Sequence, residues 1–217
     1  MLSRAALDAG DAAAAQTHVD RMAPSVEREE LLARIALARG DHAAAMGHFL
    51  DAADINALDA EVDRLRHADR IDEAYVLESA TRERLARTGT HPDAVAESFW
   101  RSGELATAHG YENPPQRDHW FLIGLDDYRQ ALALSPFSEK FLLAAGIQSL
   151  DLLQYKASRA YFARSIDVNP ASAQAYAGLG IIALRSGDRR AAQAYAARSR
   201  ALDSHSRFLA RLDRELR

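Results

Sequence analysis

The chain has 217 residues, of which 48% are hydrophobic and 27% charged, a composition typical of a folded protein rather than a disordered one. Cysteine is absent, which excludes disulfides, a thiol nucleophile and thiolate zinc sites. The net charge of −4 argues against general electrostatic attraction to nucleic acid or to an anionic membrane.

The predicted elements are helices, because alanine, the residue with the best helix propensity, is abundant. A Gly-Asp pair occurs at residues 10–11, 40–41 and 187–188, each time between two Ala-rich apolar segments. Glycine can adopt the left-handed conformation that ends a helix, and aspartate can accept hydrogen bonds from the free amides that begin the next one. Each pair is therefore predicted to be the turn of a helical hairpin.

In chain order, Leu2–Gly10 fits only the second half of a helix, and this incomplete start predicts that the chain is a fragment of a longer protein. Hairpins are predicted over Val26–Ala53 and Ile55–Leu85, with turns spaced nearer 30 than 34 residues. A further hairpin is predicted over Pro92–Pro136. It contains an inserted loop from about Tyr111 to His119, because the proline pair at 114–115 breaks helices.

Two more hairpins are predicted over Glu139–Ser172 and Ala173–Ser206, followed by a capping helix at 207–217. One face of this last helix is apolar, which suits it to sealing the final hairpin. The apolar face consists of Phe208, Leu209, Leu212 and Leu216, and the arginines expected to face outward are Arg207, Arg211, Arg214 and Arg217.

A repeat of 34 residues links these last hairpins. Pro136 and Pro170 are 34 residues apart and end similar sequence segments, and the same shift pairs Gly146 with Gly180. This spacing, with small residues at fixed places, resembles the tetratricopeptide repeat (TPR) family, whose unit is a helix A–turn–helix B hairpin. The matched positions of the last unit are Tyr176, Leu179, Gly180, Ala183, Gly187, Ala192, Ala196 and Ser199.

The resemblance implies an all-α fold, a right-handed superhelical solenoid of about six antiparallel helical hairpins, forming one domain over residues 1–217. It is strongest over 139–206, which hold two regular repeats, and looser over 1–91. The segment 92–136 is a repeat with an insertion, and 207–217 is the capping helix. A related helical-hairpin solenoid with less regular repeats is the alternative architecture.

The resemblance also implies a binding surface, because the A helices of TPR-like solenoids line a concave face that holds extended peptides or partner helices. An apolar groove edged by Lys140 and Arg185 would suit a peptide with an acidic or C-terminal carboxylate group. The alternative is that Ile147, Leu150 and Ile181 are buried between neighbouring helices. By position, the inward face includes Trp100, Glu104, Lys140, Leu143, Ile147, Leu150, Gln174, Ile181 and Arg185.

The inserted loop is a second candidate surface, because aromatic side chains commonly anchor interfaces and the loop is flanked by Tyr111 and Trp120. The alternative is that Trp120 simply packs at the start of the following helix.

No motif for catalysis or cofactor binding accompanies the repeats. The eight histidines form neither an HExxH motif nor an i, i+4 pair, so no metal site is expected. The pattern Gly178-x-Gly180 lacks the third glycine and the preceding strand of a dinucleotide site. No run of apolar residues reaches the roughly 18–20 needed to span a membrane. The chain is expected not to be an enzyme, to bind no cofactor or nucleic acid, and not to insert into a membrane.

The leading hypothesis is a non-enzymatic scaffold that binds a peptide or protein partner, as the repeat domain of a larger bacterial assembly, envelope or polysaccharide-export protein. A bacterial source fits the excess of arginine over the two lysines. An alternative is the regulatory or targeting arm of an enzyme whose catalytic domain lies outside this chain. A third hypothesis is self-association, because residues 1–108 carry a net charge of −8 and residues 109–217 one of +4. The compartment, cytoplasm or periplasm, is left open.

Overall fold

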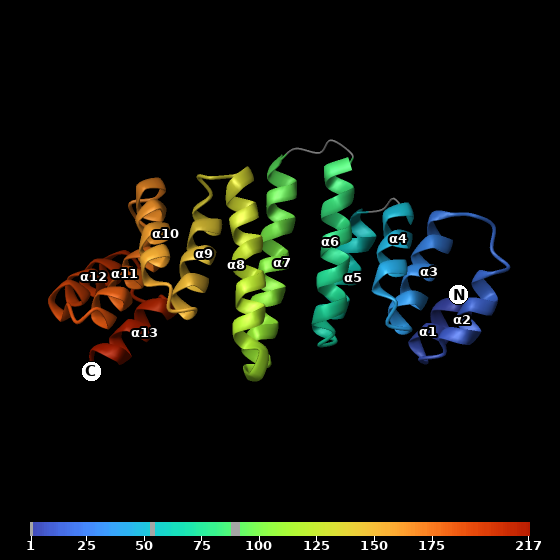
Figure 1. The fold of residues 1–217 in the computed structure, drawn as a ribbon, viewed down its shortest axis with the longest axis horizontal. Helices are drawn as coiled ribbons and strands as arrows, with labels where there is room; N and C mark the ends of the chain where they lie inside the picture. The colour runs from blue at the N-terminus through green and yellow to red at the C-terminus, as the bar shows by residue number, and fades with distance from the viewer. Residues whose placement is uncertain (1, 53–54, 88–91) are drawn as a thin grey trace. The chain divides into compact units, whose positions relative to one another are not determined.

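The computed structural model describes residues 2–52, 55–87 and 92–217, and almost all of this part of the chain is helical (Figure 1). No strand occurs among these residues. The contacts divide the chain into two compact units, Met1–Ala106 and Thr107–Arg217. The all-α fold class predicted from the sequence is confirmed. Residue 53, the predicted end of the hairpin Val26–Ala53, lies outside the described residues.

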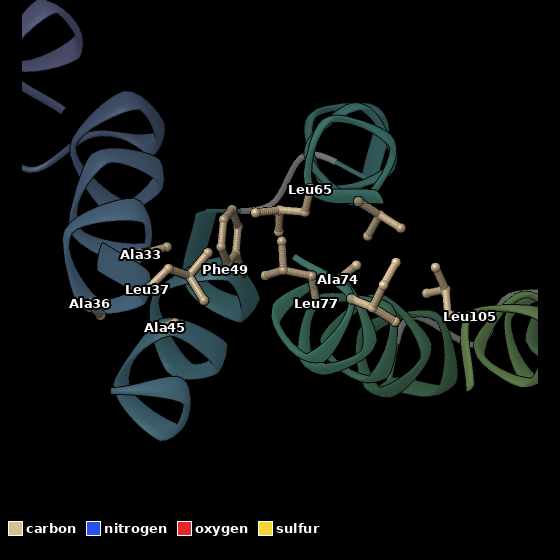
Figure 2. Close-up of a cluster of buried hydrophobic side chains, with 11 residues drawn as sticks. Ala33, Ala36, Leu37, Ala45, Phe49, Leu65, Ala74, Leu77 and Leu105 are labelled. Carbon is tan, nitrogen blue, oxygen red and sulfur yellow. The ribbon is translucent and has the colours of Figure 1, made fainter. Parts of the chain in front are cut away.

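Unit 1 is built from helical hairpins whose two helices lie against each other. Alanines 33 and 45 are fully buried in its core, where small side chains let helices approach closely. The larger side chains of Phe49, Leu65 and Leu77 fill the adjoining space (Figure 2). The helices are α1 (Leu2–Asp8), α2 (Ala12–Val19), α3 (Val26–Ala38), α4 (His42–Ala52), α5 (Ile55–His67), α6 (Ile71–Arg87) and most of α7 (Pro92–Glu112).

Unit 2 contains the segment with the 34-residue spacing. Its helices α9 and α10 form one hairpin and α11 and α12 the next, and α13 packs against both α11 and α12. The apolar face of α13 is buried through Phe208, Leu209 and Leu212. The helices that lie wholly in unit 2 are α8 (Arg117–Leu134), α9 (Glu139–Asp151), α10 (Tyr155–Val168), α11 (Ala173–Arg185), α12 (Arg189–Leu202) and α13 (Arg207–Leu216).

The segment expected to be a loop from Tyr111 to His119 is instead mostly helical. Helix α7 continues to Glu112, a short 3-10 helix, η1 (Pro114–Gln116), follows, and α8 begins at Arg117. The two prolines lie at the start of η1, where a missing amide proton costs nothing because no partner is needed there. They therefore begin a helical segment, and the extra residues lengthen α7 to 21 residues and α8 to 18.

The predicted Gly-Asp turns are confirmed. Gly10, Gly40 and Gly187 have φ values of 78°, 75° and 83°, the left-handed conformation that ends a helix. In each turn the following aspartate accepts a hydrogen bond from the amide three residues later, at 2.9–3.0 Å. The turn after α9 reaches the same geometry without glycine. Leu153 has a φ of 59°, and the amide of Gln154 donates to the carbonyl of Ser149 at 2.8 Å.

Replacing Leu153 by glycine is expected to stabilise unit 2 slightly. Left-handed backbone costs a residue with a Cβ about 1–2 kcal/mol, while glycine loses about 0.5–1 kcal/mol more backbone entropy on folding. The net expectation for Leu153→Gly is a gain of up to about 1 kcal/mol in the free energy of unfolding, measured by urea denaturation. The reverse change at the equivalent position, Gly187→Leu, should lower it. Loss of stability in Leu153→Gly would contradict this account of the turn.

A single aromatic ring fixes the distance between successive A helices of unit 2. Phe162 of α10 is fully buried. A Cβ atom placed on Gly146 of α9 would lie 2.8 Å from this ring, and one placed on Gly178 of α11 would lie 2.4 Å from it. Gly180 has the same role toward the capping helix, because its Cβ would lie 2.4 Å from Leu212. The close approach predicted at the small residues is therefore present, and it depends on the absence of side chains.

The change Gly178→Leu is expected to destabilise the protein by about 1–3 kcal/mol, because the rigid Phe162 ring leaves no room for even one added carbon. The matched control is Gly47→Ala. Gly47 also lies within a helix, but a Cβ there meets nothing within 4 Å, so this change should raise stability by about 0.5–1 kcal/mol. Chemical denaturation measures both. Equal effects of the two substitutions would show that Phe162 does not set the spacing.

Candidate partner-binding surface

The structure divides the predicted inward-facing residues between the two units. Trp100 and Glu104 lie on α7 in unit 1, where Trp100 is half-buried and Glu104 is exposed. The other seven lie on α9 and α11 in unit 2. Lys140 is at the beginning of α9 and Arg185 at the end of α11. A helix of this length extends about 20 Å, so the two cations that were expected to edge one groove stand at opposite ends of these parallel A helices.

The apolar members of the set differ in accessibility. Leu150 and Ile181 are 2% and 0% exposed and belong to the core cluster around Phe162. Leu143 and Ile147 are half-buried and pack against the same cluster. The alternative interpretation, burial between neighbouring helices, therefore holds for Leu150 and Ile181, while Leu143 and Ile147 keep part of their surface accessible.

A cavity of about 220 Å³ lies at the C-terminal ends of α9 and α11. It brings together four of the predicted residues. Tyr111 and Arg185 are polar, and Leu150 and Ile181 form an apolar floor. The full lining is Tyr111, Arg117, Phe121, Leu150, Asp151, Leu153, Tyr155, Ile181, Arg185 and Arg211.

Asp151, the last residue of α9, organises one wall of this cavity. The phenol of Tyr111 donates a hydrogen bond to one of its carboxylate oxygens at 2.6 Å, and the guanidinium of Arg211 donates to the other at 3.0 Å. The Tyr111 ring also packs edge-on against Phe121, with centroids 4.9 Å apart. Arg211 was expected to face outward on the capping helix. It instead reaches across to α9, 60 residues earlier in the chain.

The charged groups that line the cavity are mostly arginines. Arg117, Arg185 and Arg211 line it, against the single carboxylate of Asp151. Arg185 also pairs with Glu215 of α13, whose oxygen lies 3.0 Å from its Nε. This hydrogen bond, together with the charges of Arg185 and Arg211, lowers the pKa of the Glu215 carboxyl. The sequence indicated Arg185 but missed Arg117, Asp151 and Arg211, because only the packing of α8, α9, α11 and α13 brings them to one place.

Trp120, the other predicted surface aromatic, lies outside this cavity. It is half-buried on α8 and meets His109 of α7 edge-on, with ring centroids 4.5 Å apart. Its indole N–H faces the Gln116 side-chain oxygen at 3.4 Å. The alternative interpretation from the sequence, packing at the start of the following helix, describes its position in the structure.

The described residues hold no group of three or more histidine, aspartate or glutamate side chains placed to bind a metal ion. Within the same residues, no helix is both long and apolar enough to cross a bilayer.

These features define a class: an all-α protein of stacked helical hairpins with a charged, partly apolar cavity at the ends of its A helices. No protein-family model matches the chain, and no curated protein matches it by sequence. Solved structures do match. A thermophilic TPR protein of Thermus thermophilus is 16% identical over 88% of this chain and 99% of that one, with a TM-score of 0.57.

Two further neighbours cover nearly the whole chain. YrrB, described as a TPR protein with an unusual peptide-binding site, is 11% identical over 98% of this chain and 97% of its own, with a TM-score of 0.55. PilW, described as a type IV pilus biogenesis factor, is 15% identical over 97% and 94%, with a TM-score of 0.57. The fold of the chain is therefore TPR-like, as the 34-residue spacing predicts.

The ionisation of Tyr111 gives a test of the Asp151 wall. Partial burial of the phenol raises the pKa of Tyr111 well above its usual value although the residue is 57% exposed, and the hydrogen bond to Asp151 raises it further. In the unfolded chain the phenol ionises near pH 10. The stability that Tyr111 contributes is therefore present below pH 10 and is lost as the pH rises above it, because only the unfolded state gains from releasing the proton.

The expected result is that wild type is more stable than Tyr111→Phe at about pH 8, and that this difference shrinks at about pH 10.5. Urea denaturation of both proteins at the two pH values measures the difference. The contributions of other titrating groups cancel, because both proteins contain the same groups. A difference that stays the same at the two pH values would contradict the arrangement around Asp151.

Proposed function

We propose that the chain is a non-enzymatic protein–protein interaction scaffold, and that unit 2 binds an extended peptide segment bearing a carboxylate group. The observation that carries this proposal is the cavity at the ends of α9 and α11. Three guanidinium groups line it against one carboxylate, above an apolar floor. Arginine offers paired N–H donors that match the two oxygens of a carboxylate, so the cavity suits an acidic side chain or a chain terminus.

The accessible parts of α9 supply a path for the rest of the peptide. Leu143 and Ile147 are half-buried and lie two turns and one turn before Leu150, respectively, on the same helix face. Apolar side chains of an extended segment would contact these two residues while its carboxylate reaches Arg117 and Arg211. Lys140, exposed at the beginning of α9, would contact a second acidic group at the other end of the segment.

Similarity to YrrB supports this proposal, because that protein is described as having a peptide-binding site. The neighbours also include PilW, described as a type IV pilus biogenesis factor, and pilF of Pseudomonas aeruginosa. They support the narrower proposal that this chain works in a bacterial assembly in which it holds a protein partner in place.

Selection from a randomised peptide library tests the proposal. Peptides that bind wild type are expected to be enriched in aspartate, glutamate or free C-terminal carboxylates next to apolar residues. The variant Arg117→Gln should bind the selected peptides about tenfold more weakly or worse, because a charge-assisted hydrogen bond is lost. Fluorescence anisotropy measures the affinities.

The matched control for this experiment is Arg200→Gln. The side chains of Arg117 and Arg200 are both 51% exposed and both contact an aspartate, at 3.3 Å for Arg117 and 2.6 Å for Arg200. Only Arg117 lines the cavity. Arg200→Gln should bind as wild type does. Selected peptides without acidic groups, or equal affinities for the two variants, would refute the proposed site.

A further inference from the structure

Unit 1 contains a row of arginines that follows its own repeat. Arg4, Arg34 and Arg64 are spaced by 30 residues and lie on α1, α3 and α5, the first helices of three successive hairpins. Together with Arg70, from the turn before α6, they line a cavity of about 290 Å³. This cavity lies entirely within unit 1, and it shares no residue with the proposed peptide site.

The lining of this cavity is rich in guanidinium groups. Four guanidinium groups and two carboxylates, those of Asp8 and Glu61, line it. Arg4 and Arg70 also contact Glu30 and Glu73, at 3.8 Å and 2.5 Å, and neither of these two glutamates lines the cavity.

Glu61 holds two of the arginines in fixed positions. Its side chain is 1% exposed. One of its oxygens lies 2.6 Å from a terminal nitrogen of Arg64, and the other lies 2.9 Å from Nε of Arg64 and 3.3 Å from Arg34. Groups that are held in place before a ligand arrives lose little freedom when it binds. The remaining N–H groups of these arginines are therefore pre-positioned donors.

One of those donors needs an acceptor. The Nε of Arg34 is buried and has no hydrogen-bond partner within the described chain. Buried polar groups in folded proteins are normally hydrogen-bonded, and a charged donor without an acceptor is especially unfavourable. An anion in the cavity would supply that acceptor.

We infer that this cavity binds an oxyanion with two negative charges, of the phosphate or phosphate monoester class. A phosphate group carries nearly two negative charges at neutral pH and several strong acceptor oxygens, which suit the several guanidinium groups that line the cavity. A carboxylate carries one charge and two oxygens, so it would leave more of these donors unmatched.

The test is isothermal titration calorimetry of the full chain with inorganic phosphate at about pH 8 and low salt, where the phosphate is doubly charged. Saturable binding with a dissociation constant of about 1 mM or lower is expected, and acetate should bind at least tenfold more weakly. O-phosphoserine, titrated in parallel, distinguishes a phosphate monoester from free phosphate as the ligand. If it binds as tightly as phosphate, the site accepts monoesters, and if only inorganic phosphate binds, the site is specific for the free ion.

Three variants locate the binding. Arg4→Gln and Arg64→Gln should each weaken phosphate binding at least tenfold. The control is Arg66→Gln. Like Arg64, Arg66 lies on α5 and pairs with an acidic residue three positions earlier, and the two side chains are 53% and 54% exposed, but Arg66 does not line the cavity. This control should bind phosphate as wild type does.

Circular dichroism checks that each variant is folded. Arg4→Gln removes only an exposed side chain with a long ion pair of 3.8 Å, so it provides the test even if Arg64→Gln, which deprives the buried Glu61 of a partner, fails to fold. Absence of saturable phosphate binding, equal affinity for acetate, or unchanged affinity in folded Arg4→Gln would overturn the inference.

Discussion

The contact between the Phe162 ring and two glycines sets the geometry of unit 2. Gly146 and Gly178 belong to successive A helices, and each would place a Cβ atom inside the contact distance of the same buried ring. Packing in protein interiors is dense, so a ring that touches two backbones fixes the spacing and the register of both helices. The remaining features of unit 2 depend on this spacing, because they are made by residues at the ends of those helices.

The cavity of unit 2 is one such feature. Asp151 ends α9 and Arg185 ends α11, and α13 adds Arg211 from 60 residues beyond Asp151. None of these residues forms a motif with another along the chain. Their hydrogen bonds exist because the stacked helices end at the same level, and the partial negative charge of helix C-termini favours arginine there. The same arrangement recurs in unit 1, where Arg34 and Arg64 lie near the ends of α3 and α5.

The hairpin turns show how one backbone geometry is reached by different residues. Where the chain has Gly-Asp, both the left-handed residue and the aspartate cap can be predicted from their side-chain chemistry. At Asp69 the same left-handed conformation occurs in a residue that tolerates it, and at Leu153 in one that does not favour it. Hydrogen bonds close both turns in the same way, from the amide of Arg70 to the carbonyl of Leu65 and from the amide of Gln154 to the carbonyl of Ser149. The prolines at 114–115 show the opposite case, because a pair that ends helices in other contexts here begins one.

The sequence by itself determined the helical class, the 34-residue repeat, the Gly-Asp turns and the small residues of the close contacts. These are local properties: propensity, spacing and the conformational range of single residues are fixed by covalent chemistry. The tertiary structure alone decided that Arg211 turns toward Asp151, that Leu150 and Ile181 are buried, and that Arg4, Arg34 and Arg64 share one cavity. Those outcomes depend on which helix ends meet, and that is set by packing between segments far apart in the chain.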